Sequence, residues 1–335
     1  MRSTRGPARM LTVGAALAAV TVVATWLSLA VGSRPIGLSE VLGAVLGTVD
    51  SDNATVVTSQ RVPRTLLGVG VGAALGVAGA LMQGHTRNPL ADPGLFGVNA
   101  GASFAVAALA FGIGVSSPAA VVAAALLGAG LASTTVFLLG MGQRGGGLVM
   151  VAILGTTMAA LLSALTLALV LLDRQTLDVM RFWQVGSLVG RDFSLTGLVI
   201  PLGLIGLALA LLNARSLDAL SLGEDVAQSL GHDVRRARAV GILAITLLAG
   251  TSTAMCGPIV FVGLVAPHAA RVLTGHDYRW LVPFSALVGA AILLLADTVG
   301  RVAAPPGELQ AGLVVAAFGA PVLLAICRRR RLVAL

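Results

Sequence analysis

The stretch from Arg61 to Val106 constrains this chain more than any other, because two long apolar runs flank a polar connector within it. Arg61 and Arg64 open the first run, which then continues for about twenty residues without a charge. At 1.5 Å per residue, about 20 apolar helical residues cross a hydrocarbon core of about 30 Å. Lipid cannot hydrogen-bond irregular backbone, so we expect the connector at 88–97 to lie at or near a water-facing surface. The chain is therefore predicted to be an integral membrane protein.

The composition agrees with a membrane location. Of the 335 residues, 57% are hydrophobic and 11% are charged, and the mean hydropathy is +0.95; soluble domains carry about 25% charged residues. The net charge is +8, and all 22 basic residues are arginine. Arginines that orient loops in a membrane account for this excess, so no nucleic-acid partner is predicted. Cys256 and Cys327 lie in apolar runs, and the four histidines form no HExxH motif, so no metal site is predicted.

Apolar runs separated by turn residues or charges predict an all-α integral membrane protein with about ten transmembrane helices. Glycine, with 42 residues, recurs in these runs, and small residues let membrane helices approach closely. The predicted spans are 10–32, 62–83, 94–113, 117–140, 148–172, 194–213, 238–257, 259–273, 281–300 and 308–327.

The N-terminal run Leu11–Ala30 follows Arg2, Arg5 and Arg9, a pattern shared with signal peptides. Its apolar part exceeds the usual 7–15 residues of a signal peptide, and further membrane spans follow, so we predict a retained first span.

Arginine counts predict the orientation of the chain. With ten spans both termini share a side, and that side carries 15 of the 22 arginines. The arginine-rich side is predicted to be cytoplasmic, so both termini are expected inside. The other side holds Arg34, Arg61, Arg64, Arg174, Arg181, Arg191 and Arg301.

Three of these outer arginines, Arg61, Arg64 and Arg301, lie at the ends of spans, where the orientation rule disfavours them. One interpretation is interfacial snorkelling, together with an i,i+4 pair between Asp297 and Arg301. The other interpretation is a basic rim that faces an acidic partner.

The longest soluble-looking stretch on the predicted cytoplasmic side is 213–238. Its apolar residues fall near helical spacing, with a break at Gly223 and an end at Gly231, which predicts two short amphipathic helices with a bend between them. The acidic residues Asp218, Glu224 and Asp225 disfavour binding of this stretch to anionic lipid headgroups. Such a helix pair suits docking into a groove of another protein.

No catalytic constellation is evident, so we do not predict an enzyme. Asp297 and His268 are ionisable groups close to apolar runs and leave open a proton-coupled secondary transporter. Both lie near span ends, however, whereas secondary transporters place such groups near the midplane.

Four segments resemble one transporter family over nearly the whole chain, from about Arg61 to Arg329, in the family's order and spacing. They are RVPRTLLGVGVGAALGVAGALMQGHTRNPLADPGLFGVNAGA, GPIVFVGLVAPHAARVLTGHDYR, ILLLADTVGR and PPGELQAGLVVAAFGAPVLL. These segments resemble the FecCD family, the permeases of ABC importers for ferric siderophores, haem and vitamin B12. The resemblance implies a type II importer permease fold, with residues 1–335 forming a single transmembrane permease domain.

The resemblance also implies roles for individual residues. The family's R-x-P-R and A-D-x-x-x-R motifs match Arg61, Arg64 and Arg301, which implies docking of a substrate-binding protein or lipoprotein. The family's coupling helices match about 216–231, called the coupling segment below. Its candidate residues are Ser216, Leu217, Leu220, Gly223, Glu224, Asp225 and Gly231. In the span 148–172 the match is loose, and Thr156, Thr157 and Ser163 are only expected to face the path.

The chain lacks a GxxxxGK[ST] phosphate-binding loop, so ATP is expected on separate ABC ATPase subunits, with no cofactor on this chain. The resemblance therefore predicts a multi-pass permease in the cytoplasmic (inner) membrane of a bacterium, which pairs with a second permease subunit, identical or related. The predicted substrate is a metal chelate, an iron siderophore; cobalamin and haem are the alternatives.

Overall fold

The computed structural model describes residues 6–32, 35–114, 117–141, 147–190, 195–304 and 307–328. Within these ranges the regular elements are helices. They are α1 (Pro7–Ala30), α2 (Leu38–Val45), α3 (Asp52–Val56), the π-helical turn η1 (Val57–Arg61), α4 (Val62–Thr86), the 3-10 turn η2 (Pro93–Phe96), α5 (Val98–Ile113), α6 (Pro118–Met141), α7 (Gly147–Leu172), α8 (Arg174–Trp183), α9 (Thr196–Leu220), α10 (Glu224–Ser229), α11 (Val234–Cys256), α12 (Val262–Thr274), α13 (Tyr278–Ala303) and α14 (Ala311–Arg328).

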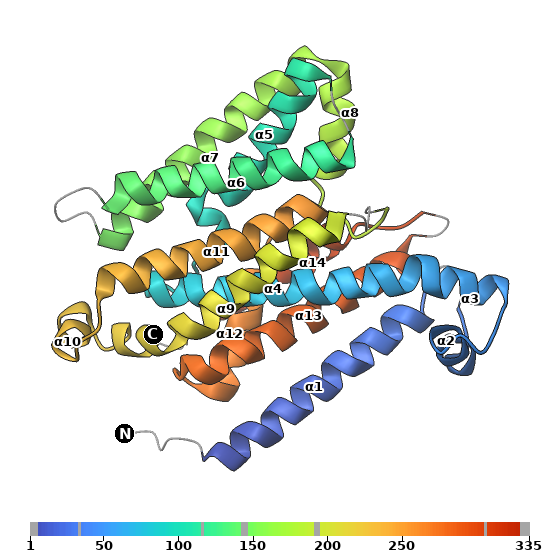
Figure 1. Cartoon of the computed structure of the whole chain (residues 1–335), viewed down its shortest axis with the longest axis horizontal. Coiled ribbons are helices and arrows are strands. Elements are labelled where there is room, and N and C mark those ends of the chain that lie inside the picture. The colour runs from blue at the N-terminus through green and yellow to red at the C-terminus, as the bar shows by residue number, and fades with distance from the viewer. Residues whose placement is uncertain are drawn as a thin grey trace.

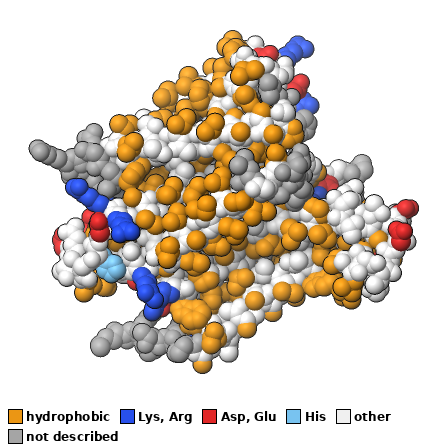
Figure 2. All heavy atoms as spheres, viewed as in Figure 1, with side chains coloured by type: hydrophobic (Ala, Val, Ile, Leu, Met, Phe, Trp, Pro, Cys, Tyr) orange, Lys and Arg blue, Asp and Glu red, His pale blue; other side chains and the backbone are white. Residues whose placement is uncertain are grey.

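Each of the ten predicted spans coincides with one helix, namely α1, α4, α5, α6, α7, α9, α11, α12, α13 and α14. Seven helical runs in the described ranges are long and apolar enough to cross a membrane, and α5 and α14 are shorter apolar helices. Figure 2 shows hydrophobic side chains over the middle of one face and charged side chains mostly at its ends. The prediction of an all-α membrane protein is confirmed.

The helices form two neighbouring groups (Figure 1). Helices α5, α6, α7 and α8 pack together, and α11 joins them to α4, α9, α12, α13 and α14 through its contact with α6. Helix α1 lies along one side, against α13. The short helices α2 and α3 lie at one end of the molecule and α10 lies at the other. We call the first the arginine end, because it carries Arg61, Arg64 and Arg301. We call the second the coupling end, because α10 belongs to the coupling segment.

Helix α4 belongs to a continuous helical run of 35 residues, Asp52–Thr86, which is about 50 Å long and therefore longer than a hydrocarbon core. Its π-helical turn η1 precedes Pro63. A proline has no N–H to donate to the carbonyl four residues earlier, and its ring crowds that carbonyl. The helical turn before Pro63 must therefore widen. The Val62 N–H accordingly donates to Val57 O, five residues back. The wider turn carries Arg61.

Glycines let the central helices touch backbone to backbone. A Cβ on Gly72 or Gly76 of α4 would overlap the backbone of α13, and a Cβ on Gly79 would overlap the carbonyl of Gly263 in α12. These contacts explain why small residues recur in the apolar runs. They hold α4, α12 and α13 together as one block.

The connector at 88–97 only partly matches the expectation of a water-facing position. Asn88 is exposed, but Ala91 and Phe96 are buried, and η2 packs against α7, α4, α6 and α11. Irregular backbone is tolerated inside a bundle of membrane helices where protein, and not lipid, surrounds it. Asp92 accepts a hydrogen bond from the Gly94 N–H at 2.8 Å, which satisfies part of this backbone. The expectation was wrong for the second half of the connector.

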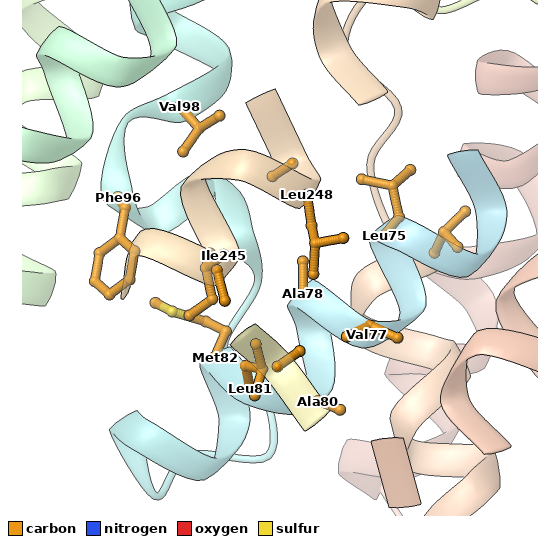
Figure 3. Close-up of a cluster of buried hydrophobic side chains, with 14 of the residues drawn as sticks. Leu75, Val77, Ala78, Ala80, Leu81, Met82, Phe96, Val98, Ile245 and Leu248 are labelled. Carbon is orange, nitrogen blue, oxygen red and sulfur yellow. The ribbon is translucent and has the colours of Figure 1, made fainter. Parts of the chain in front are cut away.

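Helices α5 and α12 are short because both begin inside the bundle. Gly97, with φ of 74°, precedes α5, and Phe261, with φ of 69°, precedes α12. A Cβ on Gly263 would lie 2.8 Å from Pro93 Cδ, so the two helix starts are neighbours. Figure 3 shows Phe96 and Val98 beside the core residues Met82 and Ile245.

Candidate functional site

The structure brings Arg61, Arg64 and Arg301 together with two acidic residues. Arg64 donates from Nε to Asp297 Oδ2 at 2.9 Å and from Nη2 to Asp297 Oδ1 at 2.8 Å. Its Nη1 donates to Glu308 Oε2 at 2.8 Å. Arg301 Nε lies 3.4 Å from Asp297 Oδ2, in the predicted i,i+4 pair. We call these five residues the arginine cluster.

Two of the arginines also bind the end of α1. Arg61 Nη1 donates to Leu29 O at 2.7 Å and to Ala30 O at 2.8 Å. Arg301 donates to Ser28 O at 2.8 Å and to Ser28 Oγ at 3.0 Å. The last carbonyls of a helix carry partial negative charge, so cations are favoured at this position. Through these bonds the cluster ties α1, α4 and α13 together.

Exposure divides the cluster into an inner part and an outer edge. Arg61, Arg301 and Asp297 are 6%, 4% and 1% exposed. The Arg64 side chain is 13% exposed and that of Glu308 is 32% exposed. The Asp297–Arg301 pair, which belongs to the first interpretation, is present. The second interpretation is a basic rim that faces an acidic partner, and the part of the cluster nearest the surface is the Arg64–Glu308 pair.

A cavity of about 470 Å³ adjoins this outer edge. Its lining includes Trp183 at the end of α8, Met255 at the end of α11, and Glu308 with Gln310 in the segment before α14. Glu308 thus both pairs with Arg64 and lines the cavity.

At the coupling end, the predicted pair of short helices is observed in a different form. Helix α9 continues to Leu220, so Ser216, Leu217 and Leu220 belong to the last turns of a spanning helix. The bend follows at Gly223, with φ of 117°, and only the second short helix, α10, is separate. Leu217 and Leu220 are 1% and 5% exposed because they pack in the core. The prediction of two helices was wrong, since the apolar spacing before Gly223 reflects packing inside the bundle.

The second half of the coupling segment faces outward. Val226 and Leu230 are 43% and 61% exposed, and Asp225 and Gly231 are also exposed. Glu224 pairs with Arg238 of α11, which holds α10 against the bundle. This end therefore presents a short helix with two exposed apolar side chains, Val226 within it and Leu230 directly after it, and an ion pair holds the start of the helix.

One contact at this end was not predicted from the sequence. Asp218 Oδ1 accepts a hydrogen bond from the Tyr278 N–H at 2.8 Å, at the start of α13. The two residues are 60 positions apart, so no local spacing signals the contact. It ties the coupling segment to α13.

The expected path residues lie on α7. Thr156, Thr157 and Ser163 are exposed, and both threonine hydroxyls donate to Ile153 O at 2.9 Å. They therefore lie on a side of α7 that this chain leaves uncovered. Among the described residues, no group of three His, Cys, Asp or Glu side chains could hold a metal ion.

This bundle of long apolar helices defines a polytopic membrane protein. The sequence profile of the FecCD transport family matches residues 20–329, and the chain belongs to this family.

Relatives and a solved structure agree with this family. The chain is 48% identical over 311 residues to the ferric enterobactin transport system permease protein FepD of Escherichia coli (strain K12), covering 92% of each. It is 37% identical to the hemin transport system permease protein HmuU of Yersinia pestis, covering 90% of this chain and 92% of the relative. A metal-chelate type ABC transporter solved in an inward-facing conformation superposes with a TM-score of 0.82 at 27% identity, covering 95% of this chain and 99% of that one.

Proposed function

We propose that this chain is the transmembrane permease subunit of an ABC importer for ferric siderophores. The observation that carries the proposal is the 48% identity to a ferric enterobactin permease over 92% of both chains. The hemin permease is similar over as much of the chain but at 37% identity, so haem is the weaker alternative. Cobalamin is the other alternative that the family resemblance leaves open. The proposed unit is a single permease domain that pairs with a second permease subunit around a shared path.

In this proposal ATP is bound and hydrolysed by separate ATPase subunits at the coupling end, which faces the cytoplasm. The chain has no phosphate-binding loop, and Val226 of α10 and Leu230 directly after it are exposed for docking into a groove. Both termini are then cytoplasmic, because α1 begins and α14 ends at the coupling end (Figure 1). The arginine end faces outward and receives a substrate-binding protein. Thr156, Thr157 and Ser163 face the path between two permease subunits.

The test is transport in proteoliposomes that contain the permease, its ATPase subunits and its substrate-binding protein. Uptake of ⁵⁵Fe-enterobactin should depend on ATP and on the binding protein, and should exceed uptake of hemin or cobalamin. The permease alone should hydrolyse no ATP. Uptake driven by a proton gradient without ATP would support a secondary transporter and overturn the proposal.

The coupling role is tested at Gly223. Its φ of 117° is strained for any residue with a Cβ, so Gly223→Val should distort the bend and lower both uptake and stimulated ATPase activity. Gly47→Val is the control, because Gly47 also has a positive φ, of 69°, but lies after α2 at the arginine end. Equal losses in the two variants would mean that the bend has no special part in coupling.

A further inference from the structure

We infer that Glu308 is a built-in competitor for the docking partner, because it occupies the position on Arg64 that an acidic side chain of the substrate-binding protein would take. This inference rests on the proposed docking at the arginine end. It adds that one residue of this chain weakens the docking and must be displaced from Arg64 when the partner binds.

The two carboxylates on Arg64 are bound in different ways. Asp297 receives two donors of the guanidinium in a bidentate arrangement, is 1% exposed, and also pairs with Arg301. A partner cannot reach or replace it without opening the bundle. Glu308 receives the single donor Nη1 at 2.8 Å. Because bidentate pairs are the stronger and more specific ones, Glu308 is the carboxylate that can be exchanged.

The position of Glu308 permits such an exchange. Its side chain is 32% exposed, and it borders the cavity of about 470 Å³ beside Trp183 and Gln310. The carboxylate can therefore leave Arg64 and remain in contact with water. It lies in residues 307–310, which are outside the helices, so its movement does not require a helix to break.

The charge of the cluster favours an added acid. Arg61, Arg64 and Arg301 supply three positive charges, while Asp297 and Glu308 supply two negative ones. Arg61 and Arg301 are nearly buried and bound to the carbonyls of α1, which leaves Arg64 as the arginine that a partner can contact. An incoming carboxylate would receive the Nη1 donor that Glu308 gives up.

The test measures binding of the transport system's own substrate-binding protein, without any lipid anchor, to the permease–ATPase complex in nanodiscs at low salt. Glu308→Gln should bind the protein roughly two- to fivefold more tightly, and Arg64→Gln should bind it more weakly by a similar factor. When Arg64→Gln is already present, adding Glu308→Gln should not raise the affinity. Asp178→Asn is the control for charge, since Asp178 forms an exposed pair with Arg181 on α8 and lies outside the cluster.

If the Arg64–Glu308 pair only stabilises the fold, removing either residue should lower thermal stability and shift the docking affinity in the same direction. If Glu308 competes with the partner, the two variants should shift the docking affinity in opposite directions. Weaker or unchanged docking of Glu308→Gln, with the unmodified complex binding normally, would overturn the inference and leave the proposed function intact. Absence of docking by the unmodified complex would overturn the proposed function itself.

Discussion

Neutralising Asp297 should destabilise the permease strongly, because this buried carboxylate pairs with both Arg64 and Arg301. Asp297 is 1% exposed, accepts hydrogen bonds from Nε and Nη2 of Arg64 and pairs with Arg301 at 3.4 Å. Removing one partner of a buried ion pair costs about 3–5 kcal/mol, because the charge that remains is desolvated and unpaired. At roughly 2 °C per kcal/mol, Asp297→Asn should lower the unfolding temperature by about 6–10 °C.

The assay is thermal unfolding of the full-length permease complex in detergent. Asp178→Asn is the matched control, since it removes the same charge from a pair whose side chains are 66% and 58% exposed, and should cost at most about 1 kcal/mol. Adding Arg301→Met to Asp297→Asn should recover part of the loss, because it removes one of the unpaired cations. If Asp297→Asn unfolded within 1–2 °C of the control (about 1 kcal/mol or less), the account of the cluster given above would be refuted.

Three further predictions, with five variants, test the packing of the bundle and the coupling segment. Gly79→Val should cost at least about 3 kcal/mol because its side chain would overlap the backbone of α12, whereas Gly70→Val, which has open space, should leave the unfolding temperature nearly unchanged. Leu217→Ala should lower stability by about 2–5 kcal/mol, and exposed Leu230→Ala should instead weaken ATPase binding in a pull-down. Asp218→Ala should cost about 1 kcal/mol and lower uptake per ATP hydrolysed; an unchanged ratio would show that its bond to Tyr278 is not used in coupling.

The positions of the ten helices that match the predicted spans were predictable, because the length and the continuous apolar character of a helix can be read directly from the sequence. The buried position of the second half of the connector was not predictable. Hydropathy marks 88–97 as polar and irregular, but only the three-dimensional packing shows that α7 and α11 cover η2. The end of α9 was misplaced for a related reason, since Leu217 and Leu220 show the same spacing whether they face a partner or the core.

The candidate site was predictable only where its contacts are local. The Asp297–Arg301 pair follows from i,i+4 spacing on one helix. The Arg64–Asp297 pair joins residues 233 positions apart, and Glu308 enters from beyond α13. Sequence reasoning could therefore identify the arginines as anomalous, but it could not find the partners that hold them.

Those partners explain why three arginines are tolerated at the end of the bundle where the orientation rule disfavours them. The rule concerns basic residues in water-facing loops near the ends of spans. Arg61 and Arg64 belong to the helical run Asp52–Thr86 and Arg301 belongs to α13, and their guanidinium groups bind carbonyls of α1 or carboxylates of the cluster. Without these three, the predicted outer side retains Arg34, Arg174, Arg181 and Arg191. On the other side Arg238 of α11 and Arg271 of α12 are likewise buried, and leaving them out keeps 13 of the 15 arginines. The arginine bias that supports the proposed orientation therefore persists when buried arginines are left out on both sides.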